Sequence, residues 1–298
     1  MRLNGLRRKE MQGDKPGILT CWFRKRIENN KNAIVTINGA TGSGKTYCGL
    51  DQAVKGSIHL NTNFNIKDNV AFDFPTLLLK TRLPQNQQPE TFYVFEEPGA
   101  VKSGASSREW QSQANRFFTS FLQTTRHKRQ ILILTCPMFS SLDILARSLT
   151  HVQIIMDYIN FKSKQSYAIP YFLQVNSRTG KIYFKKLRYY ENDKRHRLDY
   201  LISNLPPTDI IRDYEKEKQK YSDRLETMIL ESAELQRRKD LKLKATLTTA
   251  ITPERVLELH NKGMTTIEIA KLLCVSDRTI RRYKKRQIAT RTDTKTPI

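Results

Sequence analysis

The amino-acid sequence predicts an α/β fold with a mostly parallel central sheet, followed by a small all-α domain. Three observations support this fold class. A β-branched run at 33–37 leads into a glycine-rich stretch, strands alternate with helical stretches from 33 to about 160, and short helical segments with cap signals occupy 251–288. Alternation of this kind is typical of parallel sheets, because parallel strands need a crossover connection that is usually a helix.

The first strand and the loop after it form the most specific motif of the chain. Residues 39–46 read Gly-Ala-Thr-Gly-Ser-Gly-Lys-Thr, which is a complete phosphate-binding loop. The apolar run 33–37 precedes it and 47–54 has the composition of a helix. This context predicts the nucleotide site of a P-loop NTPase, whereas the alternative is an ordinary glycine-rich turn. The predicted nucleotide-binding residues are Gly39, Ala40, Thr41, Gly42, Ser43, Gly44, Lys45 and Thr46.

Each fixed position of the loop has a chemical task. Glycines let backbone N–H groups converge on phosphate oxygens. Lys45 is expected to place its ammonium at the β- and γ-phosphates, and the Thr46 hydroxyl is expected to ligate Mg²⁺. The sequence therefore predicts ATP and Mg²⁺ as cofactors.

The remaining sheet elements follow from short apolar runs. A basic lead-in at 1–30 contains a short helix near 22–27 that is expected to pack on the core, and 83–90 is a polar loop. A turn at 176–180 predicts a β-hairpin between two further runs. The predicted strands are 33–37, 57–60, 92–95, 131–135 and 152–156, with the hairpin formed by 169–175 and 181–188.

Two adjacent acids end the strand at 92–95. Acids at the carboxyl end of a parallel strand lie at the same sheet edge as the phosphate loop. We expect Glu96 to hold the Mg²⁺ shell, mainly through water, and Glu97 to act as the general base that polarises the attacking water. The alternative is a surface acidic pair at a strand end.

A helix is expected from about Arg108 to Thr125. One face carries apolar residues that we interpret as core rather than as a base-stacking platform. These residues are Ala114, Phe117, Phe118, Phe121 and Leu122. After the next strand, Thr135 either senses the γ-phosphate or is an ordinary strand-end threonine.

The basic stretch 126–129 precedes that strand. Arg126 is the first candidate for an arginine finger that reaches the nucleotide of a neighbouring subunit, with Arg129 and Arg108 as further candidates. A solvated basic loop that touches DNA is the competing interpretation.

The motif order carries a resemblance to a known family. From about residue 20 to 160, the phosphate loop, Glu-Glu strand, aromatic helix, Arg-His-Lys-Arg and Thr-Cys-Pro strand resemble the additional-strand, catalytic-glutamate division of P-loop NTPases. Within it the chain is similar to FtsK/HerA-type DNA translocases and to the zonular-occludens-toxin-like ATPases of viruses and plasmids, including archaeal elements.

The resemblance implies roles for single residues. It implies nucleotide and Mg²⁺ contacts for Lys45 and Thr46, water activation for Glu97 and phosphate sensing for Thr135. Family members often carry glutamine after that threonine, where this chain has Cys136. Toxin-like members often have a membrane-spanning segment after the ATPase, and its absence here argues against a membrane-anchored assembly factor.

The C-terminal third is predicted to be helical. Residues 208–243 are highly charged and lack Gly and Pro, so we expect an exposed helix or helical pair with a linker near 244–251. Its apolar positions, such as Tyr214 and Tyr221, are candidates for contact with the ATPase domain or a neighbour.

Residues after 251 resemble a helix-turn-helix of the resolvase-like kind. One helix is expected from 253 to about 262, a second after the Thr265–Glu268 capping box, and a third from Asp277 to about Arg286. A protein-binding three-helix module is the alternative. The predicted DNA-binding residues are Ser276, Arg278, Thr279, Arg281 and Arg282.

Composition agrees with a nucleic-acid partner. The net charge is +23 with a pI near 9.9, so the surface should attract polyanions, although a solvated basic surface is the alternative. Four scattered cysteines and the lack of a signal peptide or membrane-length apolar run predict a cytoplasmic protein that does not contact a membrane. The predicted segments are a basic lead-in (1–30), the ATPase domain (31–205), a charged helical linker (206–250), a helix-turn-helix domain (251–288) and a basic tail (289–298).

Two functions from different classes are compatible with these features. The first is an ATP-hydrolysing DNA-binding motor, such as a translocase for packaging or transfer of viral or plasmid DNA, working as a homo-oligomeric ring, for example a hexamer. The second is an ATP-switched, site-specific DNA-binding regulator of partition, replication initiation or transposition. A small-molecule kinase is a distant third.

Overall fold

The computed structural model describes residues 17–86, 88–98, 113–191, 194–250, 253–273 and 275–292. It divides into two compact units, Met1–Tyr221 and Ser222–Ile298. The boundary lies inside the predicted linker 206–250, so the first turns of that helix belong to the first unit.

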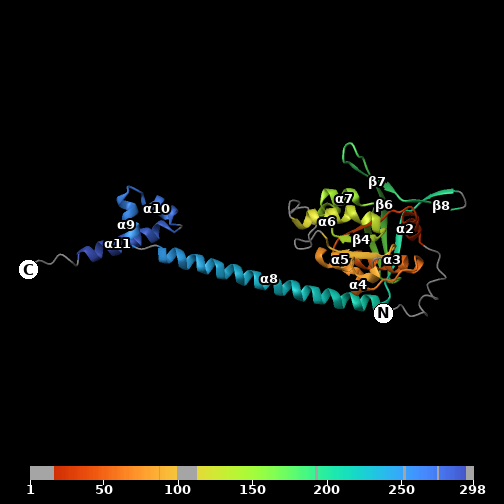
Figure 1. Ribbon diagram of the computed structural model, residues 1–298, viewed down its shortest axis with the longest axis horizontal. Helices are drawn as coiled ribbons and strands as arrows, with labels where there is room; N and C mark the ends of the chain where they lie inside the picture. Colours follow the sequence, from red (N-terminus) through yellow and green to blue (C-terminus); the bar gives the residue numbers. More distant parts are fainter. Residues whose placement is uncertain are drawn as a thin grey trace, which may run out of the picture. The chain divides into compact units, whose positions relative to one another are not determined.

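A mixed eight-stranded sheet organises the first unit (Figure 1). Its order is β10-β6-β5-β1-β4-β3-β2, with β7 paired to β6, and β2, β3, β4, β1 and β5 run parallel. A separate two-stranded ribbon pairs β8 with β9. The strands are β1 Ala33–Asn38, β2 Val70–Ala71, β3 Phe92–Glu96, β4 Ile131–Cys136, β5 Val152–Asn160, β6 Gln165–Val175, β7 Ile182–Lys186, β8 Arg188–Glu191, β9 Lys194–Arg197 and β10 Leu201–Asn204.

The central strands are buried on both faces, which explains their nearly continuous apolar sequence. Successive side chains alternate between the faces, so that in β4 Ile131 and Ile133 join one cluster while Leu132 and Leu134 join the other. Four predicted strands and the hairpin are confirmed. The largest differences in their bounds are that β5 continues to Asn160, β6 begins at Gln165, and β7 ends at Lys186 before β8 begins at Arg188.

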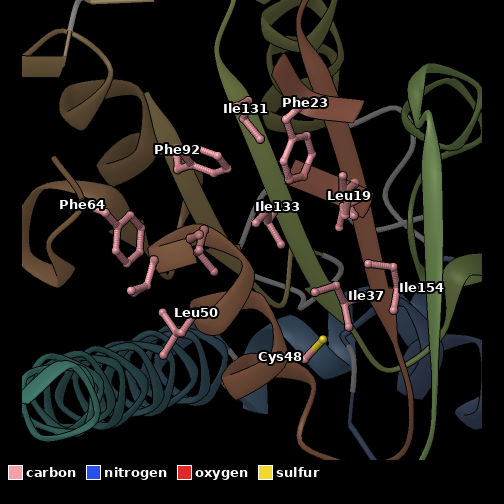
Figure 2. Packing of buried hydrophobic residues seen from close by; sticks show 14 of the residues in the cluster. Leu19, Phe23, Ile37, Cys48, Leu50, Phe64, Phe92, Ile131, Ile133 and Ile154 are labelled. Carbon is pink, nitrogen blue, oxygen red and sulfur yellow. The ribbon is translucent and has the colours of Figure 1, made fainter. Parts of the chain in front are cut away.

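Helices cover both faces of the sheet (Figure 1). The cluster in Figure 2 joins α2, α3 and the start of α8 to one face, with Phe23 and Leu50 among the fully buried residues. Helices α5, α6 and α7 contribute to the cluster on the other face. The helices of the first unit are α2 Ile18–Glu28, α3 Lys45–His59, α4 Ile66–Asn69, α5 Phe74–Lys80, α6 Gln113–Thr124 and α7 Ile144–Leu149, with 3₁₀ turns η1 Pro84–Asn86, η3 Thr125–Lys128 and η4 Phe139–Ser141.

The predicted strand at 57–60 is wrong. Residues 57–59 are the last turn of α3, which runs five residues beyond the expected helix 47–54, and the edge strand is instead β2. Leu50, Val54 and Ser57 are buried along one face of α3. Each residue added to a helix that is already packed adds one backbone hydrogen bond. This gain outweighs the low helix propensity of the β-branched Ile58.

The aromatic face predicted for the helix before β4 is confirmed in part. Phe118 and Leu122 are buried and Phe121 is partly buried, but Phe117 is 56% exposed. The sheet covers only one stripe of α6, and Phe117 lies beside that stripe. Arg108 lies outside the described residues, and so does the side chain of Ala114.

A single long helix, α8 Thr208–Ala250, replaces the predicted helix and linker. The linker predicted near 244–251 is therefore wrong for residues 244–250, which are helical. Residues 241–250 contain no Gly or Pro that would end the helix. In the first unit, Ile210 and Tyr214 are buried, and Tyr221 stacks on Phe72 with 5.2 Å between ring centroids.

The described part of the second unit also contains the helices α9 Pro253–Asn261, α10 Thr266–Leu272 and α11 Asp277–Thr292. Val256, Leu259, Ile269, Ala270 and Ile280 form their common core. The predicted capping box between Thr265 and Glu268 is present. Helix α11 continues past the predicted end at Arg286, so the tail predicted at 289–298 begins as helix. Across the described residues of both units, every helix is too short or too polar to cross a membrane.

Candidate functional site

The phosphate loop lies between β1 and α3 at the carboxyl edge of the sheet. Gly42 and Gly44 have φ values of +80° and +82°, which is left-handed backbone that favours glycine. Ser43 N–H donates to the Ala40 carbonyl at 3.2 Å, which closes the loop. Lys45 begins α3, and its Nζ donates to the Ala40 carbonyl at 3.0 Å. The loop therefore forms a concave turn at a helix N-terminus, a geometry that suits phosphate.

Glu96 lies next to this loop because of strand alternation. The side chains of Phe92 and Val94 in β3 lie on the face of the sheet that α3 covers. Every second residue of a strand points to the same face, so Glu96 lies on that face too. Its carboxylate is nearly buried, and Thr46 Oγ1 donates to Glu96 Oε1 at 3.0 Å. A hydroxyl and a carboxylate at this distance fit Mg²⁺, which prefers oxygen ligands and keeps several waters and phosphate oxygens. Among the described residues, groups of three or more His, Cys, Asp or Glu side chains that could hold a metal ion are absent.

Glu97 differs from Glu96 in both backbone and exposure. Its φ is +48°, unusual for a residue with a Cβ, and its N–H donates to the Thr135 carbonyl at 2.8 Å. The side chain is exposed and lines the cavity that also contains Lys45, Thr46 and Glu96. The structure thus brings the two predicted acids to one edge and gives them different environments.

Thr135 is opposite Glu96 on the neighbouring strand β4. It is fully buried, it lines the same cavity, and its Oγ1 has no hydrogen-bond partner within the described residues. A buried hydroxyl is normally hydrogen-bonded, so this atom has capacity for a ligand or water. Beside it, Asn38 Nδ2 donates to Cys136 Sγ at 2.8 Å, and burial raises the pKa of the Cys136 thiol to about 11.

The cavity has a volume of about 520 Å³. The phosphate loop and the two acids form one part of its wall. The β5–β6 turn and the end of β10 contribute Ile159, Phe161, Lys164, Gln165, Ser166, Ser203, Asn204 and Leu205, and α8 contributes Tyr214, Glu215 and Lys218.

Sequence reasoning missed the contribution of α8 to this site. Tyr214 is buried and its hydroxyl donates to Glu96 Oε2, while Lys218 Nζ donates to Glu96 Oε1 at 2.9 Å. Burial, followed by the charge of Glu96, raises the pKa of Tyr214 and keeps its hydroxyl protonated. The sequence marked Tyr214 as a candidate for contact with the ATPase domain, and Lys218 follows it at i+4, but neither signal pointed to Glu96.

Arg126 lies far from this site in its own chain. It is exposed in η3, before β4, whereas the phosphate loop and both acids lie where the parallel strands end. A six-residue strand separates these edges by roughly 20 Å. Arg126 and His151 line a different cavity of about 320 Å³. The structure therefore does not bring Arg126, or its neighbour Arg129, to the cavity beside the phosphate loop of the same chain.

The predicted DNA-binding residues surround the start of α11. Ser276 Oγ accepts from the Thr279 N–H at 3.2 Å, and the two hydroxyls lie 2.8 Å apart, so these residues cap the helix. Arg278, Arg281 and Arg282 are exposed, and Arg281 pairs with Asp277 at 3.3 Å.

Comparisons with known proteins give low similarity. No family model and no curated sequence matches the chain. Among solved structures, the N-terminal domain of zonular occludens toxin from Neisseria meningitidis is 14% identical, with a TM-score of 0.33 over 53% of this chain and 95% of that chain. The genome packaging NTPase B204 from Sulfolobus turreted icosahedral virus 2, in complex with ATP-gammaS, is 12% identical, with a TM-score of 0.36 over 52% and 97%. B204, the DNA-packaging ATPase from Sulfolobus Turreted Icosahedral Virus, is 12% identical, with a TM-score of 0.34 over 53% and 98%.

Proposed function

We propose that the chain is an ATP-hydrolysing motor that acts on DNA. The main support for this proposal is that the phosphate loop, a buried glutamate and an exposed glutamate lie together at one edge of the sheet. Thr46 contacts Glu96, and Glu97 lines the same cavity. Phosphoryl transfer needs this combination of anion cradle, cation site and water-orienting acid.

The residues of the cavity divide the reaction between them. Bound Mg²⁺ would supply a Lewis acid that neutralises charge on the phosphates, held by Thr46 and Glu96. Backbone N–H groups of 39–46 and the Lys45 ammonium hold the β- and γ-phosphates. Glu97 accepts a proton from the attacking water as its oxygen bonds to the γ-phosphorus, and the bond to the bridging oxygen of ADP breaks. Thr135 Oγ1 orients that water or the γ-phosphate.

Positive charge supports DNA as the partner. Besides the net charge of +23, the stretch 178–197 contains eight Lys or Arg residues against two acids. Within it Arg188 opposes Arg197 across the β8–β9 ribbon, and both are exposed. Arg197 already pairs with Asp199 at 3.2 Å, so the support for DNA comes from the excess of Lys and Arg over acids in this stretch. Contacts of Lys and Arg with the DNA phosphates do not depend on the base sequence, and a translocating motor requires this independence.

Subunit cooperation is part of the proposal. Arg126 does not reach its own nucleotide cavity, but it is exposed, and we propose that it reaches the cavity of a neighbour in a homo-oligomeric ring. An arginine supplied in trans neutralises charge that develops during phosphoryl transfer. Hydrolysis would then depend on assembly.

A second candidate function is an ATP-switched regulator that binds one DNA site. The exposed arginines at the start of α11, on a three-helix core, favour it. In this case nucleotide would control assembly on a specific sequence, and turnover would be slow.

The rate of ATP hydrolysis with different DNAs tests these two functions. A motor should be stimulated many-fold by duplex DNA of any sequence, and stimulation should fall steeply with salt. A regulator should need its own site. Absence of ATP binding under all conditions would contradict both, and mass in solution with and without nucleotide would report ring formation.

A further inference from the structure

Within the part of the chain that the structure describes, Glu96 has three side-chain partners, and two of them come from α8. Thr46 and Lys218 both contact Oε1, at 3.0 and 2.9 Å, and Tyr214 contacts Oε2. Lys218 Nζ also lies 3.0 Å from the Tyr214 hydroxyl oxygen. The ammonium is thus placed beside the same carboxylate oxygen that receives the Thr46 hydroxyl.

This arrangement compensates a charge that would otherwise be costly. Only 6% of the Glu96 side chain is exposed, whereas 46% of the Lys218 side chain is exposed. A buried carboxylate without a cation nearby is strongly unfavourable, so Glu96 needs a positive partner. The Lys218 ammonium is already partly in water, so it can move away from Glu96 into solvent once another cation takes its place.

The first turns of α8 have further contacts beside the site. Tyr47 donates to Glu215 at 2.9 Å, and Tyr221 stacks on Phe72. The position of Lys218 is therefore set by several neighbouring contacts on α8 and does not depend on Glu96 alone.

We propose that Lys218 is a displaceable counter-ion of Glu96, which neutralises the carboxylate when no divalent cation is bound and competes with that cation. This inference rests on the proposed function, because it concerns the cation site of the same nucleotide. Lys218 holds the Glu96 carboxylate in the absence of a divalent cation, and a cation held by Thr46 and Glu96 would displace it.

The test is the affinity for Mg²⁺ of the full chain saturated with a non-hydrolysable ATP analogue, measured by calorimetry and corrected for Mg²⁺ binding by the free analogue. Lys218→Met should tighten apparent Mg²⁺ binding about three- to ten-fold, as expected for loss of one partly exposed competing ion pair. Lys218→Arg should stay within about two-fold of the unmodified chain, because it keeps the charge.

Lys220→Met is the matched control. Lys220 lies on the same helix and pairs with Glu217 at 2.6 Å, so this substitution removes a lysine–glutamate pair away from Glu96. It should leave the Mg²⁺ affinity unchanged. Unchanged or weaker Mg²⁺ binding in Lys218→Met would overturn the proposal, and weaker binding would indicate that Lys218 contacts phosphate instead.

A nucleotide-free measurement separates this inference from the proposed function. Thermal unfolding of the chain, Lys218→Met, Glu96→Gln and the double variant should show non-additive changes in Tm, with the double variant less destabilised than the two single changes together predict. Additive changes would contradict the counter-ion role. If the analogue does not bind the unmodified chain, the nucleotide function fails while this cycle still tests the pair.

Discussion

The Oγ1 of Thr46 lies 3.0 Å from the Oε1 of Glu96, although the two residues are 50 positions apart in the chain. The contact joins the first turn of α3 to the last residue of β3. It depends on β3 pairing with β4, which pairs in turn with β1, so that the strands end at one edge. This relationship makes two separate sequence motifs one site.

Glu97→Gln should lower ATP turnover strongly and retain nucleotide binding. The amide keeps the size of the side chain but cannot accept a proton from water, and loss of a general base typically lowers kcat by about 10²- to 10⁴-fold. Single-turnover hydrolysis and equilibrium binding of a fluorescent ATP analogue would measure the two effects. A normal hydrolysis rate would exclude Glu97 as the base.

Glu97→Gly serves as the fold control for that residue. Because φ of Glu97 is +48°, glycine should relieve backbone strain and raise the free energy of unfolding by up to about 1 kcal/mol. It should lose turnover as Glu97→Gln does, which separates the catalytic loss from any loss of stability.

Lys45→Ala should weaken ATP binding by about ten-fold or more, because it removes the ammonium that is expected to contact the β- and γ-phosphates. Lys67→Ala, which removes an exposed lysine of α4, is the charge-matched control and should bind normally. Equal losses in both variants would indicate general electrostatics instead of a specific phosphate contact.

His151 makes stability depend on pH. Burial, followed by the charge of Arg26, lowers the pKa of His151 to about 3, and the Ile34 N–H donates to its Nδ1 at 3.1 Å. The folded chain therefore keeps this imidazole neutral, while the unfolded chain protonates it below about pH 6.5. Stability present above that pH should be lost as pH falls toward 3, at up to about 1.4 kcal/mol per pH unit.

Urea unfolding at pH 7 and pH 5.5 would measure this loss. His151→Asn should flatten it, since the amide oxygen can still accept from the Ile34 N–H without titrating. His127→Asn, at an exposed histidine of η3, should keep the pH dependence of the unmodified chain. An equal slope in His151→Asn would assign the effect to other groups.

The double variant Arg281→Ala, Arg282→Ala should weaken DNA binding and leave DNA-free ATP hydrolysis intact. If both arginines contact phosphates, the slope of log K against log salt concentration should become shallower by about 2, because each lost contact removes about 0.9 from its magnitude. Arg255→Ala, on the exposed face of α9 and paired with Glu258, should leave the slope unchanged. Simultaneous loss of DNA binding and thermal stability would point to a folding role.

Arg126→Ala should bind ATP normally but hydrolyse it about 10³-fold more slowly if Arg126 acts on a neighbouring subunit. Mixing it with Lys45→Ala subunits should restore part of the activity, because some interfaces then combine an intact cavity with an intact arginine. Failure of every mixing ratio to restore activity would contradict the trans role.

Local sequence determined much of this protein. The glycine pattern of 39–46 predicted a phosphate loop followed by a helix, and the apolar runs predicted the four central strands, because both depend on backbone conformation and burial within a few residues. The sequence also predicted that Glu96 and Glu97 lie at the same edge as the loop, since carboxyl ends of parallel strands meet there.

Only the tertiary structure decided what surrounds that edge. Residues 57–60 have local preferences for both strand and helix, and packing of α3 on the sheet selected the helix. The sequence marked Tyr214 only as a candidate for contact with the ATPase domain and assigned no role to Lys218, yet both residues contact Glu96 from more than a hundred positions later in the chain. Contacts of that sequence separation have no local signature, because they arise from sheet order and from where a distant helix packs.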